Sequence, residues 1–210
     1  MLRYAITDRR TLGPGDPTAL LAAQAGLWAR AGIDWVQMRE KDLSAGELER
    51  VARAMLAAIR SAGGRTRLLV NGRVDVALAA GADGVHLTAH PEELGVVQVR
   101  RLWTAERSPV ISVSCHSVEE VDRAREGGAD MALFGPVFGK RLPGERTLPG
   151  LGLERLREAC HAGEADSLPV LALGGVTEKN TAQCLAAGAA GVAGIRLFGA
   201  ISLEQQARPE

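Results

Sequence analysis

The sequence predicts one α/β domain folded as a (β/α)8 barrel, also called a TIM barrel. Four similar stretches each read as a helix end, a glycine, a short turn and a buried strand, with the glycines at Gly32, Gly81, Gly128 and Gly188. Each spacing is long enough for two βα units. The apolar runs "YAIT", "LLV", "VISVS" and "VLAL" fill the gaps, so eight strands alternate with helical segments.

The individual elements carry local signals of their own. Pro17 is suited to the first position of a helix, and Ser117 with Glu120 forms a capping-box pattern before another. Thr177 is an N-cap signal, and glycine after a helix end suits a left-handed cap. The strands are continuously apolar, as expected for a parallel sheet covered by helices. No glycine-rich dinucleotide motif follows the first strand, which argues against a doubly wound sheet.

Composition limits the classes of function. The 210 residues are predicted to form one domain over 1–210, with a frayed tail from about 203. Charges balance to zero and aromatic residues make up 3%, so we expect no nucleic-acid partner, and no apolar run predicts a membrane span. Three widely spaced cysteines and the absence of a signal-peptide pattern favour the cytoplasm. The sequence leaves open whether the chain forms a homo-oligomer.

In such a barrel the site lies at the carboxyl ends of the strands. Gln37, Arg39 and Lys41 alternate after the second strand and are predicted to share one face. Two inward cations favour capture of a phosphate or carboxylate, because buried unpaired charge is costly. The alternative is a salt-bridge network with acids such as Glu40. Asn71 ends the third strand and is a further candidate substrate-binding residue.

A phosphate site is predicted at the ends of the last two strands. Gly174 and Gly175 precede the helix capped by Thr177, so bare backbone N–H groups and a helix N-terminus meet there. A tight turn that merely needs glycine is the alternative. Ile195 and Arg196, just after the eighth strand, are predicted to complete the site, with a plain surface position as the alternative for Arg196.

Histidines supply the candidate acid–base groups. His116 ends the fifth strand on the same side as Ser114, a predicted substrate-binding residue, and an imidazole can accept and return a proton near neutral pH. A capping or packing role for His116 is equally compatible with the sequence. His86 lies inside a strand and is predicted to be a hydrogen-bonded core histidine. Cys115 is predicted to be a small buried residue, because strand neighbours point to opposite faces.

The motifs "QMREK", "VNGRVDVAL", "GADGVHL", "SVSCHSVEEV", "LFGPVF" and "VLALGGV" occur in this order along nearly the whole chain. Together they resemble the thiamin phosphate synthase and thiazole tautomerase superfamily, whose two branches are (β/α)8 barrels of thiamin biosynthesis. The resemblance implies one of two reactions. The synthase joins a pyrimidine diphosphate to a thiazole phosphate and needs Mg²⁺. The tautomerase moves one proton on a thiazole carboxylate phosphate without a metal.

Departures from the synthase pattern favour the tautomerase branch. The turn after the third strand reads Asn71-Gly72, where the synthase has Asn-Asp and its aspartate binds Mg²⁺. Ala89 stands where the synthase has glutamine, and Glu92 or Glu93 would replace its second carboxylate only by a shift. The segment "FGKRLPGERTLPG" lacks the threonines of the synthase loop.

The resulting prediction is a metal-independent isomerase, a thiazole tautomerase. By resemblance, His116 would be its catalytic residue and a thiazole phosphate its small-molecule substrate. We expect no cofactor, with Mg²⁺ only if the synthase alternative holds, and the intact "QMREK" motif keeps that alternative open. A third reading is a non-catalytic regulator that binds a phosphate ligand.

Overall fold

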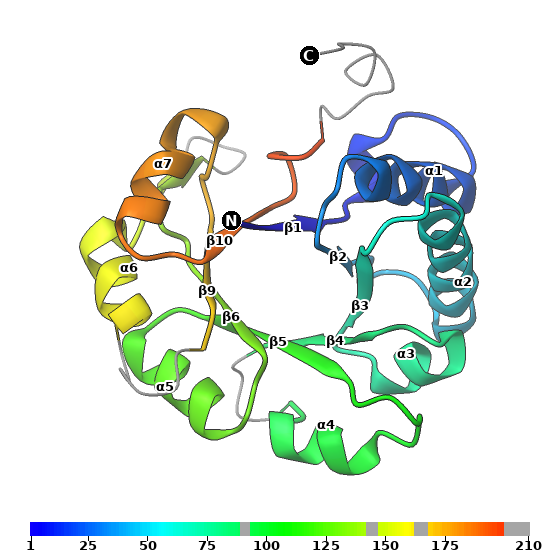
Figure 1. Cartoon of the computed structure of the whole chain (residues 1–210). Coiled ribbons are helices and arrows are strands. Elements are labelled where there is room, and N and C mark those ends of the chain that lie inside the picture. Colours follow the sequence, from blue (N-terminus) through cyan, green and yellow to red (C-terminus); the bar gives the residue numbers. More distant parts are fainter. Residues whose placement is uncertain (89–92, 142–146, 162–167, 200–210) are drawn as a thin grey trace.

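The predicted barrel is confirmed by the computed structural model, which describes residues 1–88, 93–141, 147–161 and 168–199. Eight parallel strands close into a ring in the order β1-β10-β9-β6-β5-β4-β3-β2, with the helices outside it (Figure 1). The barrel strands are β1 (Leu2–Ile6), β2 (Trp35–Met38), β3 (Arg67–Asn71), β4 (Gly84–Leu87), β5 (Val110–Cys115), β6 (Met131–Phe134), β9 (Val170–Leu173) and β10 (Gly191–Gly194).

The helices follow the strands in the expected alternation. They are η1 (Arg9–Thr11), α1 (Pro17–Arg30), α2 (Ala45–Ser61), α3 (Val74–Ala80), α4 (Val96–Leu102), α5 (Val118–Glu126), α6 (Gly152–His161) and α7 (Glu178–Ala186). A small antiparallel pair, β7 (Lys140–Arg141) and β8 (Thr147–Leu148), lies outside the ring in the segment between β6 and α6. The predicted frayed tail lies outside the described residues.

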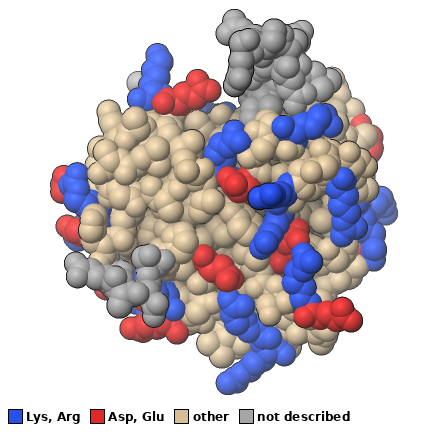
Figure 2. All heavy atoms as spheres, in the orientation of Figure 1, with Lys and Arg blue, Asp and Glu red and all other residues tan. Residues whose placement is uncertain are grey.

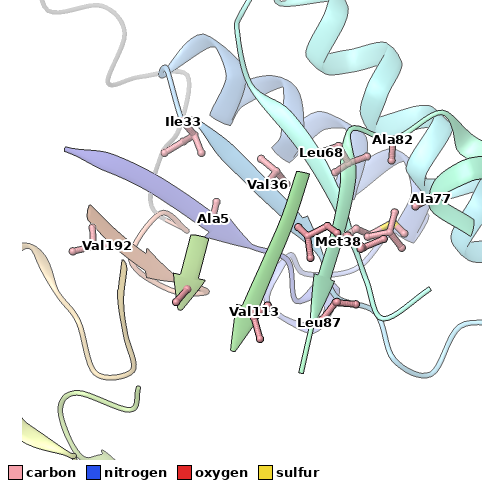
Figure 3. Packing of buried hydrophobic residues seen from close by; sticks show 14 of the residues in the cluster. Ala5, Ile33, Val36, Met38, Leu68, Ala77, Ala82, Leu87, Val113 and Val192 are labelled. Atoms are coloured by element: carbon pink, nitrogen blue, oxygen red, sulfur yellow. The ribbon is translucent and has the colours of Figure 1, made fainter. Parts of the chain in front are cut away.

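Alternation along each strand divides the core into two layers. Outward-facing residues such as Val36, Met38 and Leu68 are fully buried between the sheet and the helices, and Figure 3 shows part of this layer. Inward-facing residues fill the barrel with a separate apolar cluster, which includes Leu69 and Leu171. Parallel strands buried on both faces explain why the strand sequences are continuously apolar.

The four-fold repeat has a physical cause at the amino ends of the strands. Gly32, Gly81, Gly128 and Gly188 all have positive φ, as predicted for left-handed helix caps. The residue two positions later begins the turn into the next strand, and in three repeats it is an aspartate: Asp34, Asp83 and Asp130.

Each aspartate makes two bonds to the preceding strand. The Asp34 N–H donates to the Arg3 carbonyl at 3.1 Å, and the Asp34 carboxylate accepts from the Arg3 N–H at 2.8 Å. Asp83 and Asp130 repeat this pair of bonds on Leu68 and Ile111. We call this arrangement the aspartate clamp. It satisfies a strand N–H that lies beyond the reach of the neighbouring strand.

The fourth repeat lacks the clamp. Ala190 occupies the aspartate position, and its N–H donates to the Val170 carbonyl at 2.9 Å. Because alanine has no side-chain oxygen, the second bond of the clamp is not available between β9 and β10.

Charges on the surface follow the neutral composition. Figure 2 shows basic and acidic side chains interspersed over the visible face, without a large area of one sign. In the described part of the chain, no helix combines the length and apolar character that crossing a membrane requires.

Candidate functional site

A chain of hydrogen bonds runs through the barrel interior and ends near its mouth. Tyr4 Oη lies 2.9 Å from Ser112 Oγ, and Ser112 Oγ lies 2.8 Å from Nδ1 of His86. On the other side of the ring, His86 Nε2 lies 2.8 Å from Ser114 Oγ. Tyr4, Ser112 and His86 are buried, whereas Ser114 is only partly buried. The expected core histidine is confirmed, and it joins the barrel centre to a predicted substrate-binding serine.

Burial sets the charge state of this network. Burial, with a smaller contribution from the nearby charge of Arg39, lowers the pKa of His86 to about 3. Burial also raises the pKa of the Tyr4 phenol, against a smaller opposing effect of the Ser112 hydrogen bond. At neutral pH the imidazole is therefore uncharged and has one ring hydrogen.

Gln37 and Asn71 form a second polar group in the barrel mouth. The Gln37 amide nitrogen donates to Asn71 Oδ1 at 2.8 Å, across the ends of β2 and β3. Gln37 is 1% exposed, and its Oε1 is buried without a hydrogen-bond partner. A buried acceptor without a partner is costly, so this oxygen is a ready contact for a ligand that donates a hydrogen bond.

The two predicted cations lie at different depths. Arg39 is half-buried, close enough to His86 to affect its pKa, whereas Lys41 is exposed in the turn after β2. Among the described residues, neither side chain makes an ion pair. β2 ends at Met38, and Lys41 lies in the turn that follows. The expectation that all three residues share one face therefore holds only as far as Arg39, one residue past the strand.

Glu40 does not neutralise these cations. Its carboxylate accepts from the Thr7 hydroxyl at 2.7 Å and from the Arg9 guanidinium at 3.0 Å, on the side away from the barrel axis. Glu40 is 5% exposed, so its charge is used in joining β2 to the turn after β1. The alternative of a salt-bridge network with Glu40 is therefore wrong, and Arg39 remains available to an anion.

The Gly174-Gly175 turn is a tight structure that leaves N–H groups free. Both glycines have positive φ, at 90° and 65°, and a Cβ on Gly175 would lie 2.7 Å from Cβ of Phe138. In the described part of the chain, the N–H groups of Gly175 and Val176 donate to no protein acceptor. Asn180 accepts from the N–H of Thr177 at 2.7 Å, which orders the entry to α7. This turn has the donors that a phosphate requires.

A three-residue segment fixes the position of that turn. The Val137 N–H donates to the Leu173 carbonyl at 2.8 Å, and the Phe138 N–H donates to the Gly174 carbonyl at 3.0 Å. On its other side, the Pro136 carbonyl accepts from Leu151 at 2.8 Å. We call Pro136–Phe138 the staple segment, because it joins the loops after β6 and β9.

Ile195 and Arg196 line a different hollow from the barrel mouth proper. A cavity of about 190 Å³ lies between the ends of β1 and β10 and helix α1, with Ile195, Arg196, Asp8 and Gln24 in its lining. Arg196 is exposed, and Ile195 also packs against the inner apolar cluster. Their predicted part in phosphate binding stays a prediction.

His116 is held by its neighbours at the rim. Its Nδ1 lies within hydrogen-bonding distance of the Gly135 carbonyl, and its N–H donates to Glu120 Oε2 at 2.6 Å. Because a carbonyl only accepts, the ring hydrogen lies on Nδ1 and leaves Nε2 as the exposed atom. The predicted capping box is confirmed in part, since Ser117 Oγ accepts from Glu120 N–H, but the Glu120 side chain binds one residue earlier. A catalytic role for His116 stays a prediction.

The turn after β3 supplies no carboxylate for a cation. Gly72 has φ 65°, and a Cβ added there would meet no atom within 4 Å. Among the described residues, no group of three or more His, Cys, Asp or Glu side chains could hold a metal ion. The Glu93 carboxylate accepts from the Thr88 hydroxyl at 2.7 Å, while Ala89 and Glu92 lie outside the described residues. The described residues do not fit a protein-bound Mg²⁺ of the synthase type.

Two participants were not identified from the sequence. Tyr4 and Ser112 join the histidine network, although their strands are far apart in the chain. The alternation of Ser112, Ser114 and His116 in "VISVSCH" was the available signal, because it places all three on the inner face. Cys115, between them, is fully buried, and burial raises the pKa of its thiol to about 12, as expected for a packing residue.

Comparison with known proteins gives consistent names. The chain is 44% identical over 193 residues to the "Putative thiamine-phosphate synthase" of Geobacter sulfurreducens, covering 90% of this chain and 83% of the relative. It is 38% identical over 190 residues to the "Thiamine-phosphate synthase" of Roseiflexus sp., covering 90% and 75%. The structure of "Thiamine phosphate pyrophosphorylase from Pyrococcus furiosus" matches with a TM-score of 0.74 and 29% identity, covering 95% of this chain and 91% of that one.

These relatives correct one expectation. They are named for the synthase reaction, so the prediction of a thiazole tautomerase, an isomerase, is wrong. Its main argument was the missing carboxylate at Gly72, but loss of one ligand does not specify a different reaction.

The family assignment rests on almost the whole chain. The model of the family described as thiamine monophosphate synthase matches residues 3–198, which include every barrel strand except the first residue of β1. The chain belongs to the thiamine monophosphate synthase family.

Proposed function

We propose that this protein is a thiamine-phosphate synthase, a transferase that joins a pyrimidine diphosphate to a thiazole phosphate. Relatives that carry this name support the proposal over 90% of the chain. The observation in the structure that supports it is a pair of separate positions at one barrel mouth whose groups suit anions. One is the Arg39 side of β2, and the other is the Gly174-Gly175 turn after β9.

The ring order keeps these two positions apart. The strands run β2, β1, β10, β9 around the barrel, so the two positions lie three strands from each other. A reaction between two phosphorylated substrates needs two anion sites, with the reacting atoms between them. Arg39 has no ion-pair partner among the described residues and suits the diphosphate, whereas the free N–H groups of Gly175 and Val176 suit the single phosphate.

The groups between the anion sites suit a polar ring. Gln37 Oε1 is a hydrogen-bond acceptor without a partner. Ser114, near the end of β5, faces the barrel interior and is only partly buried. The nitrogen acceptors of a pyrimidine ring suit the Ser114 hydroxyl, and a hydrogen-bond donor on the ring would suit Gln37 Oε1. Holding the ring there would orient the carbon that carries the diphosphate. Orientation of two substrates can lower the barrier greatly, because it replaces a random encounter by a fixed approach.

His116 keeps a proposed role at the rim. Its Nδ1 is bound to the Gly135 carbonyl, so Nε2 is the atom available to a substrate or to the departing diphosphate. A cytoplasmic location fits such a biosynthetic enzyme and the three free cysteines. The described residues supply no complete ligand set for Mg²⁺, so we propose no protein-bound cofactor and derive no step from one.

The assay that tests the function is direct. The protein is incubated with the pyrimidine diphosphate and the thiazole phosphate, with Mg²⁺ or with EDTA, and thiamin phosphate and released diphosphate are measured by chromatography. We expect both products in equal amounts. Arg39→Gln should raise the KM for the pyrimidine diphosphate about tenfold or more. The matched control is Arg10→Gln, since the Arg10 side chain is exposed and, among the described residues, pairs only with Asp42, at 3.5 Å. Absence of thiamin phosphate at every Mg²⁺ concentration would refute the proposal.

A further inference from the structure

The chain of hydrogen bonds from Tyr4 to Ser114 contains more groups than the binding of a substrate needs. Ser114 alone reaches the mouth, yet three buried residues stand behind it. In the described part of the chain, the polar side-chain atoms of Tyr4, Ser112 and His86 contact only one another and Ser114. In such a closed group, every hydrogen must find its acceptor within the group.

The buried part has three hydrogens to place, one each on Tyr4, Ser112 and the neutral ring of His86. If the ring hydrogen is on Nε2, Tyr4 donates to Ser112, Ser112 donates to Nδ1, and Nε2–H donates to Ser114. Every hydrogen then has an acceptor, at 2.9, 2.8 and 2.8 Å between the heavy atoms.

The opposite arrangement leaves one hydrogen without an acceptor. If the ring hydrogen is on Nδ1, it must donate to Ser112 or, at 3.5 Å, to Tyr4. The two hydroxyls then have only each other, and one of their hydrogens has no acceptor in an interior without exposed surface. An unsatisfied buried donor is costly, and the cost favours the first arrangement by about 5- to 150-fold.

From this we infer that His86 is a positioning residue, which holds Ser114 as a hydrogen-bond acceptor so that the Ser114 hydroxyl hydrogen points into the barrel mouth. Ser114 is thereby fixed as a donor toward an acceptor atom of the bound substrate, a ring nitrogen or an oxygen. This inference rests on the proposed function for its catalytic consequence, but the direction of the hydrogen bonds does not.

The direction is tested on the folded protein without substrate. In protein labelled with ¹⁵N-histidine, the ring nitrogens of His86 are assigned by their loss in His86→Asn, and the nitrogen that carries the hydrogen is read from its shift. We expect Nε2–H. In Tyr4→Phe, Nδ1 is the one acceptor left to the Ser112 hydrogen among the described side chains, so Nε2–H should persist there as well. An Nδ1–H ring in the unmodified protein would overturn the inference.

The positioning role is tested with a pair of substitutions at one residue. The amide nitrogen of a glutamine can take the place of Nε2 and donate to Ser114, whereas the shorter asparagine reaches only the place of Nδ1. His86→Asn should lower kcat about 100-fold, and His86→Gln should keep it within about tenfold of the unmodified enzyme. Thermal unfolding of both variants serves to exclude loss of the fold.

A double-substitution cycle separates positioning from general packing. If His86 acts through Ser114, then adding His86→Asn to Ser114→Ala should lower kcat by less than about threefold. A full 100-fold further loss in that background would overturn the positioning role. A further outcome separates the two proposals. If neither the unmodified protein nor any variant makes thiamin phosphate, but the His86 ring has its hydrogen on Nε2, then the proposed function is wrong and the inferred direction of the hydrogen bonds is still correct.

Discussion

The Asp83 carboxylate accepts a hydrogen bond from the Leu68 N–H at 2.9 Å, and the Asp83 N–H donates to the Leu68 carbonyl at the same distance. This aspartate clamp fastens β3 to β4 at the end of the barrel opposite the site. Residues at that end contribute to stability rather than to chemistry.

Removing the clamp should therefore lower stability without changing catalysis. Asp83→Ala leaves a partly buried N–H without its charged acceptor, and we expect a loss of about 1–3 kcal/mol in the free energy of unfolding. The control is Asp75→Ala, which removes an exposed ion pair with Arg73 and should cost less than about 1 kcal/mol. Denaturant unfolding measures both. A fall in kcat for Asp83→Ala greater than for Asp75→Ala would contradict this division of roles.

Adding the missing clamp should have the opposite effect. Ala190→Asp places a carboxylate where the Val170 N–H lacks the second bond, and we expect a gain of about 0.5–1.5 kcal/mol. Ala190→Val provides a similar volume with no acceptor and is the matched control. Equal stability of the two variants would show that solvent already satisfies this group.

The Gly174-Gly175 turn, the proposed phosphate site, should be sensitive to one added methyl group. Gly175 has φ 65°, and a Cβ there would lie 2.7 Å from the Phe138 Cβ. Gly175→Ala should therefore displace the turn and weaken binding of the thiazole phosphate about tenfold or more. Gly63 has nearly the same φ, 68°, with no atom within 4 Å of an added Cβ. Gly63→Ala therefore reports the backbone cost alone, about 1 kcal/mol. Calorimetric titration gives the affinities, and an unchanged Kd in Gly175→Ala would place the phosphate elsewhere.

Acid should destabilise the protein through His86. The folded pKa of about 3 lies below the ordinary value of 6.5, so the unfolded chain binds the proton first as the pH falls. Stability should decline from about pH 6.5 toward pH 3, by about 2 kcal/mol at pH 5 from this residue. His86→Gln cannot titrate, and the difference between the two unfolding curves measured from pH 7 to pH 4 isolates the effect. Parallel curves would mean that His86 is solvated.

The Gly72 position should control the demand for Mg²⁺. The left-handed backbone there tolerates Asp and Asn better than most residues, and the space for a side chain is open. If the proposed function is correct, Gly72→Asp should lower the Mg²⁺ concentration that gives half-maximal activity, because it adds an oxygen ligand beside Asn71. Gly72→Asn adds similar volume without the charge and is the control. Identical Mg²⁺ curves for the two variants would show that the cation does not approach this turn.

The repeats predicted the fold because each one reflects a conformational requirement of the residues next to it in sequence. A helix that ends before a strand needs a left-handed residue, and Gly32 and Gly81 meet that need within a few residues of chain. The same local logic identified Gln37 and the Gly174-Gly175 turn from their places at strand ends, and the structure puts both at the mouth.

Longer-range relationships could not be predicted in this way. Glu40 lies in the middle of a cationic motif, yet it turns outward because Thr7 and Arg9, from another strand end, satisfy its carboxylate. Tyr4 reaches Ser112 only because the barrel closes and brings distant strands face to face. The reaction could not be predicted from one residue either. Gly72 shows that this turn has no carboxylate for a cation, but it does not show which substrates the barrel mouth converts.

The staple segment has a consequence for how this barrel could diversify. A Cβ on Gly150 would lie 2.4 Å from the Val137 carbonyl oxygen and 2.7 Å from the Gly139 nitrogen. The backbone just before β7 and the backbone just after β8 are therefore in close contact. Insertions between these ends would add little closure entropy, since that cost grows only slowly with loop length. Pro136–Phe138 would meanwhile keep the glycine turn in place. The sequence between these ends can thus lengthen or change without disturbing the Gly174-Gly175 turn.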